Sequence, residues 1–265
     1  MKETVATPCQ SPVSCKICGM SSLFFERAQV LRKYRVQYFR CQHCGFIQTE
    51  EPYWLEEAYT TAIAMQDVGI MQRNLANCEL TSAVLNLLFP KASCAVDYGA
   101  GHGIFVRLMR DRGFNFSWFD RYAENDYARG FEYEIGSKYD FLTAFELLEH
   151  LPNPLADLSA IMDMSDNVFV STYTVPEPAP ALADWWYFSP SSGQHVAFYT
   201  PKSLQIIAEL FGRRCFSHGA YHLFCKKPKS AFLFKIATKL RIARNVNRLY
   251  RRRSLIERDL LQMVK

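Results

Sequence analysis

The sequence predicts an α/β protein: a mixed sheet with helices on both faces, preceded by a small cysteine-rich ribbon and followed by a basic helical tail. Three observations lead to this prediction. The first 50 residues hold two Cys-x-x-Cys pairs, a glycine-rich turn follows a short apolar strand near residue 100, and the last 40 residues are rich in Lys and Arg. With 265 residues, 49% of them apolar and 22% charged, the composition is that of a folded chain and not of a disordered one.

The pattern divides the chain into four parts. We expect the ribbon over residues 1–55, a helical connector over 56–92, the main α/β domain over 93–228 and the helical tail over 229–265. The stretch from Leu75 to Leu88 in the connector is a candidate lid. One main domain with small appendages suits a chain of this length.

The two cysteine pairs predict a metal site. They read Cys-Lys-Ile-Cys-Gly and Cys-Gln-His-Cys-Gly, with 22 residues between them, and their cysteines are Cys15, Cys18, Cys41 and Cys44. Two intervening residues let both thiolates of a tight turn reach one ion, and four thiolates in a tetrahedral array suit zinc. Because four thiolates leave no open coordination position, we expect a structural Zn²⁺ in a zinc ribbon and not a catalytic one. The alternative is a redox dithiol, which needs one pair at a strand-to-helix junction instead of two matched turns.

The glycine-rich turn predicts a nucleotide-binding βαβ unit. A short apolar strand ends in Asp97, a turn with three glycines leads into an amphipathic helix, and a second strand, from Phe116, ends in Asp120. Glycines let the backbone approach a ligand, and the second acid can accept hydrogen bonds from ribose hydroxyls. A dinucleotide fingerprint would need a glycine where Ile104 stands, and the chain has no Gly-x-x-x-x-Gly-Lys phosphate loop.

The segment Asp-Tyr-Gly-Ala-Gly-His-Gly, over residues 97–103, resembles the first motif of the class I, Rossmann-like S-adenosylmethionine-dependent methyltransferases. Residues 138–154, which contain Tyr-Asp-Phe-Leu-Thr-Ala-Phe-Glu-Leu-Leu-Glu-His, resemble the fourth strand and following turn of the same family. The resemblance covers residues 93–226, about half of the chain. It implies a methyltransferase of the small-molecule or saccharide type found near surface-polysaccharide synthesis, acting by O- or C-methylation.

The resemblance also implies which residues bind S-adenosylmethionine. Those around the methionine and ribose would be Asp97, Gly99, Ala100, Gly101 and Gly103. Asp120 would bind the ribose hydroxyls, Arg121 or Tyr122 would flank the adenine, and Phe145 and Glu146 would face the cofactor from the other side. The span over residues 121–137 is short, and it leaves the contact with the adenine amino group unassigned.

The acceptor is expected beside the aromatic stretch over residues 185–199, which follows the fifth strand and reads Trp-Trp-Tyr-Phe-Ser-Pro-Ser-Ser-Gly-Gln-His-Val-Ala-Phe-Tyr. Ligands bind at the carboxyl edge of open α/β sheets. His195 is the candidate base or acceptor-binding group, because acceptors such as hydroxyls and carbon acids need a general base; the alternative is that it supports the loop by hydrogen bonds. Glu149 and His150 are further candidates, with capping and fixing the turn as their alternative role.

The tail differs in charge from the rest of the chain. Residues 226–265 hold 13 of the 31 Lys and Arg and only two of the 26 acids, which gives the tail a charge of +11 and the rest −6. Apolar residues recur at helical spacing from Phe232 to Val246, with bases on the other face. This pattern predicts a helix on an anionic membrane surface near a lipid-linked acceptor. RNA binding by ribbon and tail, in an RNA methyltransferase, and packing against protein are the alternatives.

A third hypothesis for the whole chain is that it is a non-enzymatic cofactor-sensing or scaffold module.

The sequence also bears on localisation. No run of 18 apolar residues occurs, and the segment from Met1 to Pro12 lacks the apolar core of a signal peptide. We therefore expect a cytoplasmic protein, with peripheral membrane contact through its tail.

Overall fold

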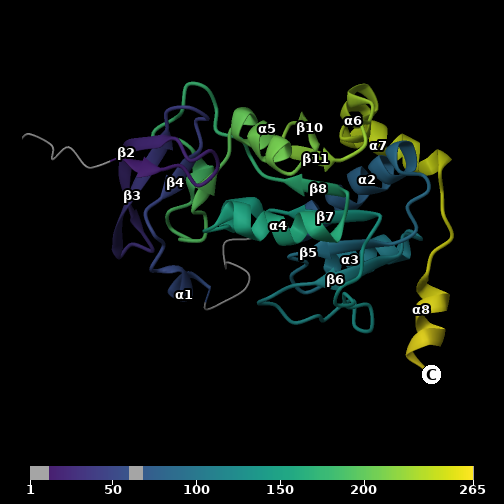
Figure 1. Cartoon of the computed structure of the whole chain (residues 1–265). Helices are drawn as coiled ribbons and strands as arrows, with labels where there is room; N and C mark the ends of the chain where they lie inside the picture. The colour runs from purple at the N-terminus through teal and green to yellow at the C-terminus, as the bar shows by residue number, and fades with distance from the viewer. Residues whose placement is uncertain (1–11, 60–67, 265) are drawn as a thin grey trace, which may run out of the picture.

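The computed structural model describes residues 12–59 and 68–264, which form two sheets with helices packed around the larger one (Figure 1). Parts of the predicted ribbon and connector, and Cys9, lie outside the described residues.

The smaller sheet is the predicted ribbon, extended by one strand from elsewhere in the chain. Its order is β1-β2-β3-β4-β9, and all its pairs are antiparallel. The strands are β1 (Val13–Ser14), β2 (Ser21–Val30), β3 (Tyr34–Cys41), β4 (Ile47–Thr49) and β9 (Ala197–Phe198). Because β9 comes from the aromatic stretch, the ribbon sheet is joined directly to the segment that was predicted to face the acceptor.

The larger sheet has the order β10-β11-β8-β7-β5-β6. Its strands are β5 (Ala95–Tyr98), β6 (Phe116–Phe119), β7 (Phe141–Phe145), β8 (Asn167–Ser171), β10 (Arg214–His218) and β11 (Tyr221–Cys225). The first four are parallel, and β11 runs antiparallel to both β8 and β10. This is the mixed sheet of a Rossmann-like methyltransferase fold, as predicted.

The edge beside β6 explains the short span that follows it. Beyond this strand, the described residues form a single parallel bridge, between Trp118 and Glu132. Residues 121–137 therefore supply a loop with a bridge instead of an additional strand.

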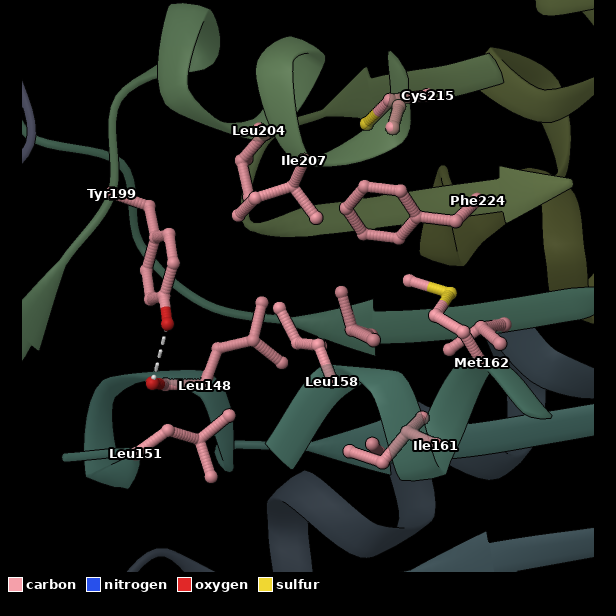
Figure 2. Packing of buried hydrophobic residues seen from close by; sticks show 14 of the residues in the cluster. Leu148, Leu151, Leu158, Ile161, Met162, Tyr199, Leu204, Ile207, Cys215 and Phe224 are labelled. Carbon is pink, nitrogen blue, oxygen red and sulfur yellow. Dashed lines mark hydrogen bonds between the residues drawn. The ribbon is translucent and has the colours of Figure 1, made fainter. Parts of the chain in front are cut away.

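Helices cover both faces of the larger sheet, as predicted. One face carries α4 (Pro154–Met164) and α5 (Pro201–Leu210), whose apolar side chains interdigitate with those of β8 and β11 (Figure 2). The other face carries α2 (Ile70–Leu88), α3 (Ile104–Asp111), α6 (Ala231–Ala237) and α7 (Leu240–Leu249). Short helices at α1 (Leu55–Ala58) and α8 (Ile256–Met263) complete the fold.

The connector is not the lid that the sequence predicted. The C-terminal half of α2 is buried against α3, α6 and α7, and side chains such as Leu80, Ala83 and Val84 are almost fully inaccessible to solvent. This helix is part of the core: the apolar residues that suggested a lid pack against the elements that cover one face of the larger sheet. Only its N-terminal turns, around Arg73 and Asn77, reach a cavity.

The tail forms three short helices instead of one long one. In α7 the predicted apolar row packs on α2: Ala243 is buried, and Leu240 and Val246 lie against the same core cluster. Phe232 remains exposed. The packing thus uses most of the row within the chain, and contact with a membrane or with RNA stays a prediction. Within the described residues no helix is long and apolar enough to cross a bilayer.

Candidate functional site

A cavity of about 680 Å³ opens at the carboxyl ends of β5, β6 and β7. The glycine turn, the loop after β6 and the residues after β7 line one part of it, and the aromatic stretch lines another. Pockets of a few hundred Å³ at this edge of an α/β sheet are the usual place for small ligands. The sheet therefore brings the predicted cofactor and acceptor segments into one cavity.

Asp120 fastens the glycine turn to the end of β6. Its Oδ2 accepts a hydrogen bond of 2.8 Å from the Gly101 amide, and its Oδ1 accepts bonds from the amides of Tyr122 (2.7 Å) and Ala123 (2.9 Å). Gly99 and Gly101 have φ values of 75° and 53°, a region that glycine enters without strain. The two segments that the resemblance assigns to the nucleoside are thus held as one unit.

Gly103 has a different role from the predicted one. It is not among the residues that line the cavity, and it begins α3 with a φ of 86°. A Cβ atom here would lie 2.8 Å from Oδ1 of Asn125 and 3.2 Å from the Ala128 backbone nitrogen. The position needs glycine because the loop over residues 125–128 packs against the turn.

Asp97 lies at the bottom of the site, buried to 4% exposure. The Thr143 hydroxyl on the neighbouring strand β7 donates a hydrogen bond of 2.5 Å to its Oδ1. Burial raises the pKa of Asp97 to about 7; the bond from Thr143 opposes this rise, and the nearby Asp120 adds to it. The carboxyl is therefore poised between its two protonation states at neutral pH.

The remaining predicted cofactor residues also reach the cavity: Ala100, Arg121, Phe145 and Glu146. Glu146 has a φ of 49°, and its Oε1 accepts a hydrogen bond of 2.6 Å from Ser171 at the end of β8. Arg121 lies 3.7 Å from the carboxylate of Asp157 on α4. These contacts fix the turn after β7 and the loop after β6 on opposite sides of the glycine turn.

His195 and His150 meet at the other end of the cavity. Their ring centroids are 4.9 Å apart, with the planes at 87°. The Val196 amide donates a hydrogen bond of 2.8 Å to the Glu149 carbonyl, and this bond joins the short 3₁₀ turn η1 (Leu148–His150) to the aromatic stretch. Tyr199 donates a further bond of 2.9 Å to the Leu148 carbonyl (Figure 2). Backbone contacts thus bring together residues that are 45 positions apart.

Burial governs the charge of this group. Desolvation lowers the pKa of His150 to about 3, with His195 adding to the effect and the Gln194 carbonyl opposing it. Desolvation also lowers the pKa of His195 to about 4. It raises the pKa of Glu149 to about 8, together with the charge of Glu146 and against the hydroxyls of Tyr187 and Thr172. Both rings are consequently neutral at pH 7, so each has a nitrogen lone pair.

The sequence did not single out one aromatic residue of the cavity, Tyr59. Its hydroxyl, just after α1, donates to or accepts from Nδ1 of His150 at 2.8 Å, and its ring stacks on Tyr122 at 5.5 Å. Trp186, which the sequence offered as a residue that could stack on a sugar ring or close the core, has 69% of its surface exposed while it lines the cavity. Only the folded chain brings Tyr59 to the site, because no local pattern marks it.

The four predicted metal ligands converge as expected. All four sulfur atoms lie within 4.8 Å of one another, with Sγ–Sγ distances of 3.6 Å from Cys44 to both Cys15 and Cys18 and 3.5 Å from Cys18 to Cys41. A tetrahedral zinc ion with Zn–S bonds of about 2.3 Å would separate its sulfurs by about 3.8 Å. Amides of both turns, those of Ile17 and Cys44, donate to the sulfurs at 3.4 Å. The cluster therefore fits zinc.

Comparison with known proteins gives one family match. The profile of the family described as "Methyltransferase domain" matches residues 71–217. No curated protein matches the chain.

Several solved structures share part of the fold. An O-methyltransferase family protein from Burkholderia thailandensis is 16% identical, with 64% of this chain and 66% of that one covered and a TM-score of 0.45. Human N-acetylserotonin methyltransferase in complex with SAM is 14% identical, with 67% of each chain covered and a TM-score of 0.44. DesVI from Streptomyces venezuelae is 13% identical, with 62% and 99% covered and a TM-score of 0.46. The chain thus spans about two thirds of the length of the first two.

The raised pKa of Asp97 predicts a pH dependence of stability. The folded state keeps the proton up to about pH 7, whereas the unfolded chain releases it near 3.8. Stability should therefore decline between about pH 4 and pH 7 and then level off. Between pH 5 and pH 8, wild type should lose about 3 kcal/mol relative to Asp97→Asn, which cannot ionise. Urea unfolding of both proteins at the two pH values measures this difference; parallel curves would show that ionised Asp97 is tolerated without cost.

Proposed function

Because the matched profile covers more than half of the chain, this protein belongs to the methyltransferase-domain family, and we propose that it transfers the methyl group of S-adenosylmethionine to a small-molecule acceptor. The observation that supports the proposal is the hydrogen bond from the Gly101 amide to Asp120, at the rim of a cavity that His195 also lines. In this proposal the methyl donor and the acceptor bind in the same cavity. Methyl transfer needs mainly such in-line positioning.

In this proposal the ribose hydroxyls bind Asp120 and the methionine portion lies along the glycine turn. Oδ2 of Asp120 accepts a single bond, from the Gly101 amide, and so retains a lone pair for a ribose hydroxyl, whereas Oδ1 already accepts from two loop amides. The adenine would lie by Arg121 and Tyr122, and Phe145 and Glu146 would face the sulfonium. This orientation directs the methyl group toward the histidines, because they line the same cavity on the side of the aromatic stretch.

The acceptor is proposed to be saccharide-like and to be methylated at oxygen or carbon. Trp186 offers an exposed aromatic face at the cavity, and aromatic rings commonly pack against apolar ligand faces while polar groups fix orientation. His195 would act as proton acceptor or as an acceptor-binding group. Its Nδ1 is held by the Tyr187 carbonyl at 2.6 Å, which leaves Nε2 with the lone pair.

We also propose that the ribbon holds a structural zinc ion. The main domain contacts the cluster: Thr200, which caps α5, donates a hydrogen bond of 2.5 Å to the Cys44 carbonyl, and Lys202 bonds to the His43 carbonyl. The metal would stabilise the ribbon and, through these contacts, the start of α5.

Cofactor binding can be tested with one substitution and a matched control. Asp120→Ala removes the carboxylate that both holds Gly101 and would bind the ribose, so S-adenosylmethionine affinity should fall at least about tenfold. Glu124→Ala, an exposed acid in the same loop, should bind as wild type does. Titration calorimetry with S-adenosylmethionine, S-adenosylhomocysteine and NAD measures this. Binding of NAD but of neither sulfur nucleoside, or equal binding by both variants, would refute the assignment.

The zinc proposal predicts a specific stoichiometry. The purified protein should contain zinc, and Cys41→Ser should hold one zinc ion per chain fewer than the wild type and unfold at lower temperature, because structural zinc contributes directly to folding. The control Cys94→Ser removes a thiol that lies outside the cluster and bonds to Asp140, and it should retain zinc. Metal analysis and thermal melts of the three proteins decide; metal-free wild type with an unchanged melt after Cys41→Ser would contradict the proposal.

A further inference from the structure

A second group of metal-ligating side chains lies at the acceptor end of the cavity. One ligand atom from each of Glu149, His150 and His195 lies within 4.8 Å of the other two. Glu149 and His150 are neighbours on η1, and His195 comes from the segment before β9. The backbone bond from Val196 to Glu149 holds the two segments together, so the grouping does not depend on flexible side chains alone.

Both histidine rings are oriented through the same nitrogen. Nδ1 of His195 is 2.6 Å from the Tyr187 carbonyl, and Nδ1 of His150 is 2.8 Å from the Tyr59 hydroxyl. A carbonyl can only accept, so Nδ1 of His195 carries the proton and its Nε2 carries a lone pair. Metal-ligating histidines are typically held in this way, with one ring nitrogen bonded to a protein oxygen and the other left for the metal.

Glu149 supplies the independent observation. Its side chain is fully buried, and within residues 12–59 and 68–264 neither carboxyl oxygen accepts a hydrogen bond of normal geometry, although the hydroxyls of Tyr187 and Thr172 lie close enough to lower its pKa. The nearby hydroxyls of Thr172 and Tyr187 lie 3.0 Å from each other and bond together. A buried carboxyl group is costly unless it is paired or coordinates a metal.

We propose that Glu149, His150 and His195 bind one divalent transition-metal ion. Two imidazoles and one carboxylate form a donor set that suits ions such as Zn²⁺, Fe²⁺ or Co²⁺, and three protein ligands leave a coordination position open. Because His150 and His195 line the cavity, that open position faces the space assigned to the acceptor. The four cysteines form a closed site of a different kind, made of other residues.

The role of this ion rests on the proposed function and narrows its substrate class to acceptors with a metal-binding hydroxyl group. A hydroxyl bound to a divalent cation releases its proton to solvent at a lower pH than a free one. The oxygen then forms a bond to the methyl carbon while the carbon–sulfur bond breaks and its electron pair goes to sulfur, which leaves S-adenosylhomocysteine. His195 serves here as a ligand that binds the acceptor indirectly, and the cation replaces a protein base.

Cobalt is a suitable probe because it distinguishes the two sites. Wild-type protein that carries one zinc ion per chain, at the four cysteines, and no other metal is titrated with Co²⁺ and followed by calorimetry and absorption spectroscopy. We expect one Co²⁺ per chain with a visible spectrum of nitrogen and oxygen ligands and without thiolate charge-transfer bands. Glu149→Gln and His195→Gln should each weaken Co²⁺ binding at least about tenfold.

The control is His218→Gln. His218 lies outside the cavity and is hydrogen-bonded to Thr238, so this variant should bind Co²⁺ as the wild type does. Circular dichroism checks that each variant folds. If the variants do not fold, anomalous diffraction from Co²⁺-soaked crystals of the wild type gives the answer, since the proposal requires a peak in contact with all three residues. No Co²⁺ beyond the cysteine site, or a peak elsewhere, would overturn it.

Two binding results distinguish loss of the metal site from loss of the methyltransferase assignment. Wild type that binds S-adenosylhomocysteine but no Co²⁺ at these residues would remove the metal site and leave methyl transfer, with His195 as base. Co²⁺ binding without any binding of S-adenosylhomocysteine would keep the metal site and remove the methyltransferase assignment.

Discussion

The segment from Gln194 to Thr200 connects the ribbon, the main sheet and the cavity, and the arrangement of the site depends on its contacts. Gln194 donates a side-chain bond of 2.9 Å to the Ala58 carbonyl, and the Val196 amide bonds to Glu149. β9 then adds to the ribbon sheet, Tyr199 bonds to η1, and Thr200 caps α5. Most of these bonds are buried, and breaking a buried hydrogen bond is costly because it leaves a polar group without a partner. The segment can therefore move only together with the elements that it contacts.

This connection gives the ribbon a role in the site. The sheet that carries the four cysteines ends in a strand of the main domain, and the Cys44 carbonyl accepts a bond from Thr200. In our proposal, zinc at the four cysteines therefore supports the position of His195 through Thr200, which follows it by five residues. Loss of the metal would therefore displace the residues at the acceptor end of the cavity more than those of the glycine turn.

The sequence predicted those parts of the fold whose determinants are local. The glycine turn is specified by residues that need positive φ or a close approach, and the cysteine spacing fixes both cysteine turns. β10 lacks an apolar run, since Arg214, Ser217 and His218 interrupt it, and it was not predicted. The connector was misread because its apolar pattern is the same for a lid and for a core helix. Gly103 was misassigned because its neighbour, Asn125, comes from a loop whose path the sequence does not reveal.

The candidate site shows the same division. The acid-ended strands predicted the part of the cavity that we assign to the nucleoside, whereas Tyr59 and the meeting of Glu149, His150 and His195 depend on long-range backbone pairing. The most direct test of the account is a crystal structure of the protein with S-adenosylhomocysteine. The account predicts the ribose hydroxyls on Asp120 and the sulfur directed across the cavity toward His195. Nucleoside bound away from the glycine turn, or sulfur directed away from the histidines, would contradict it.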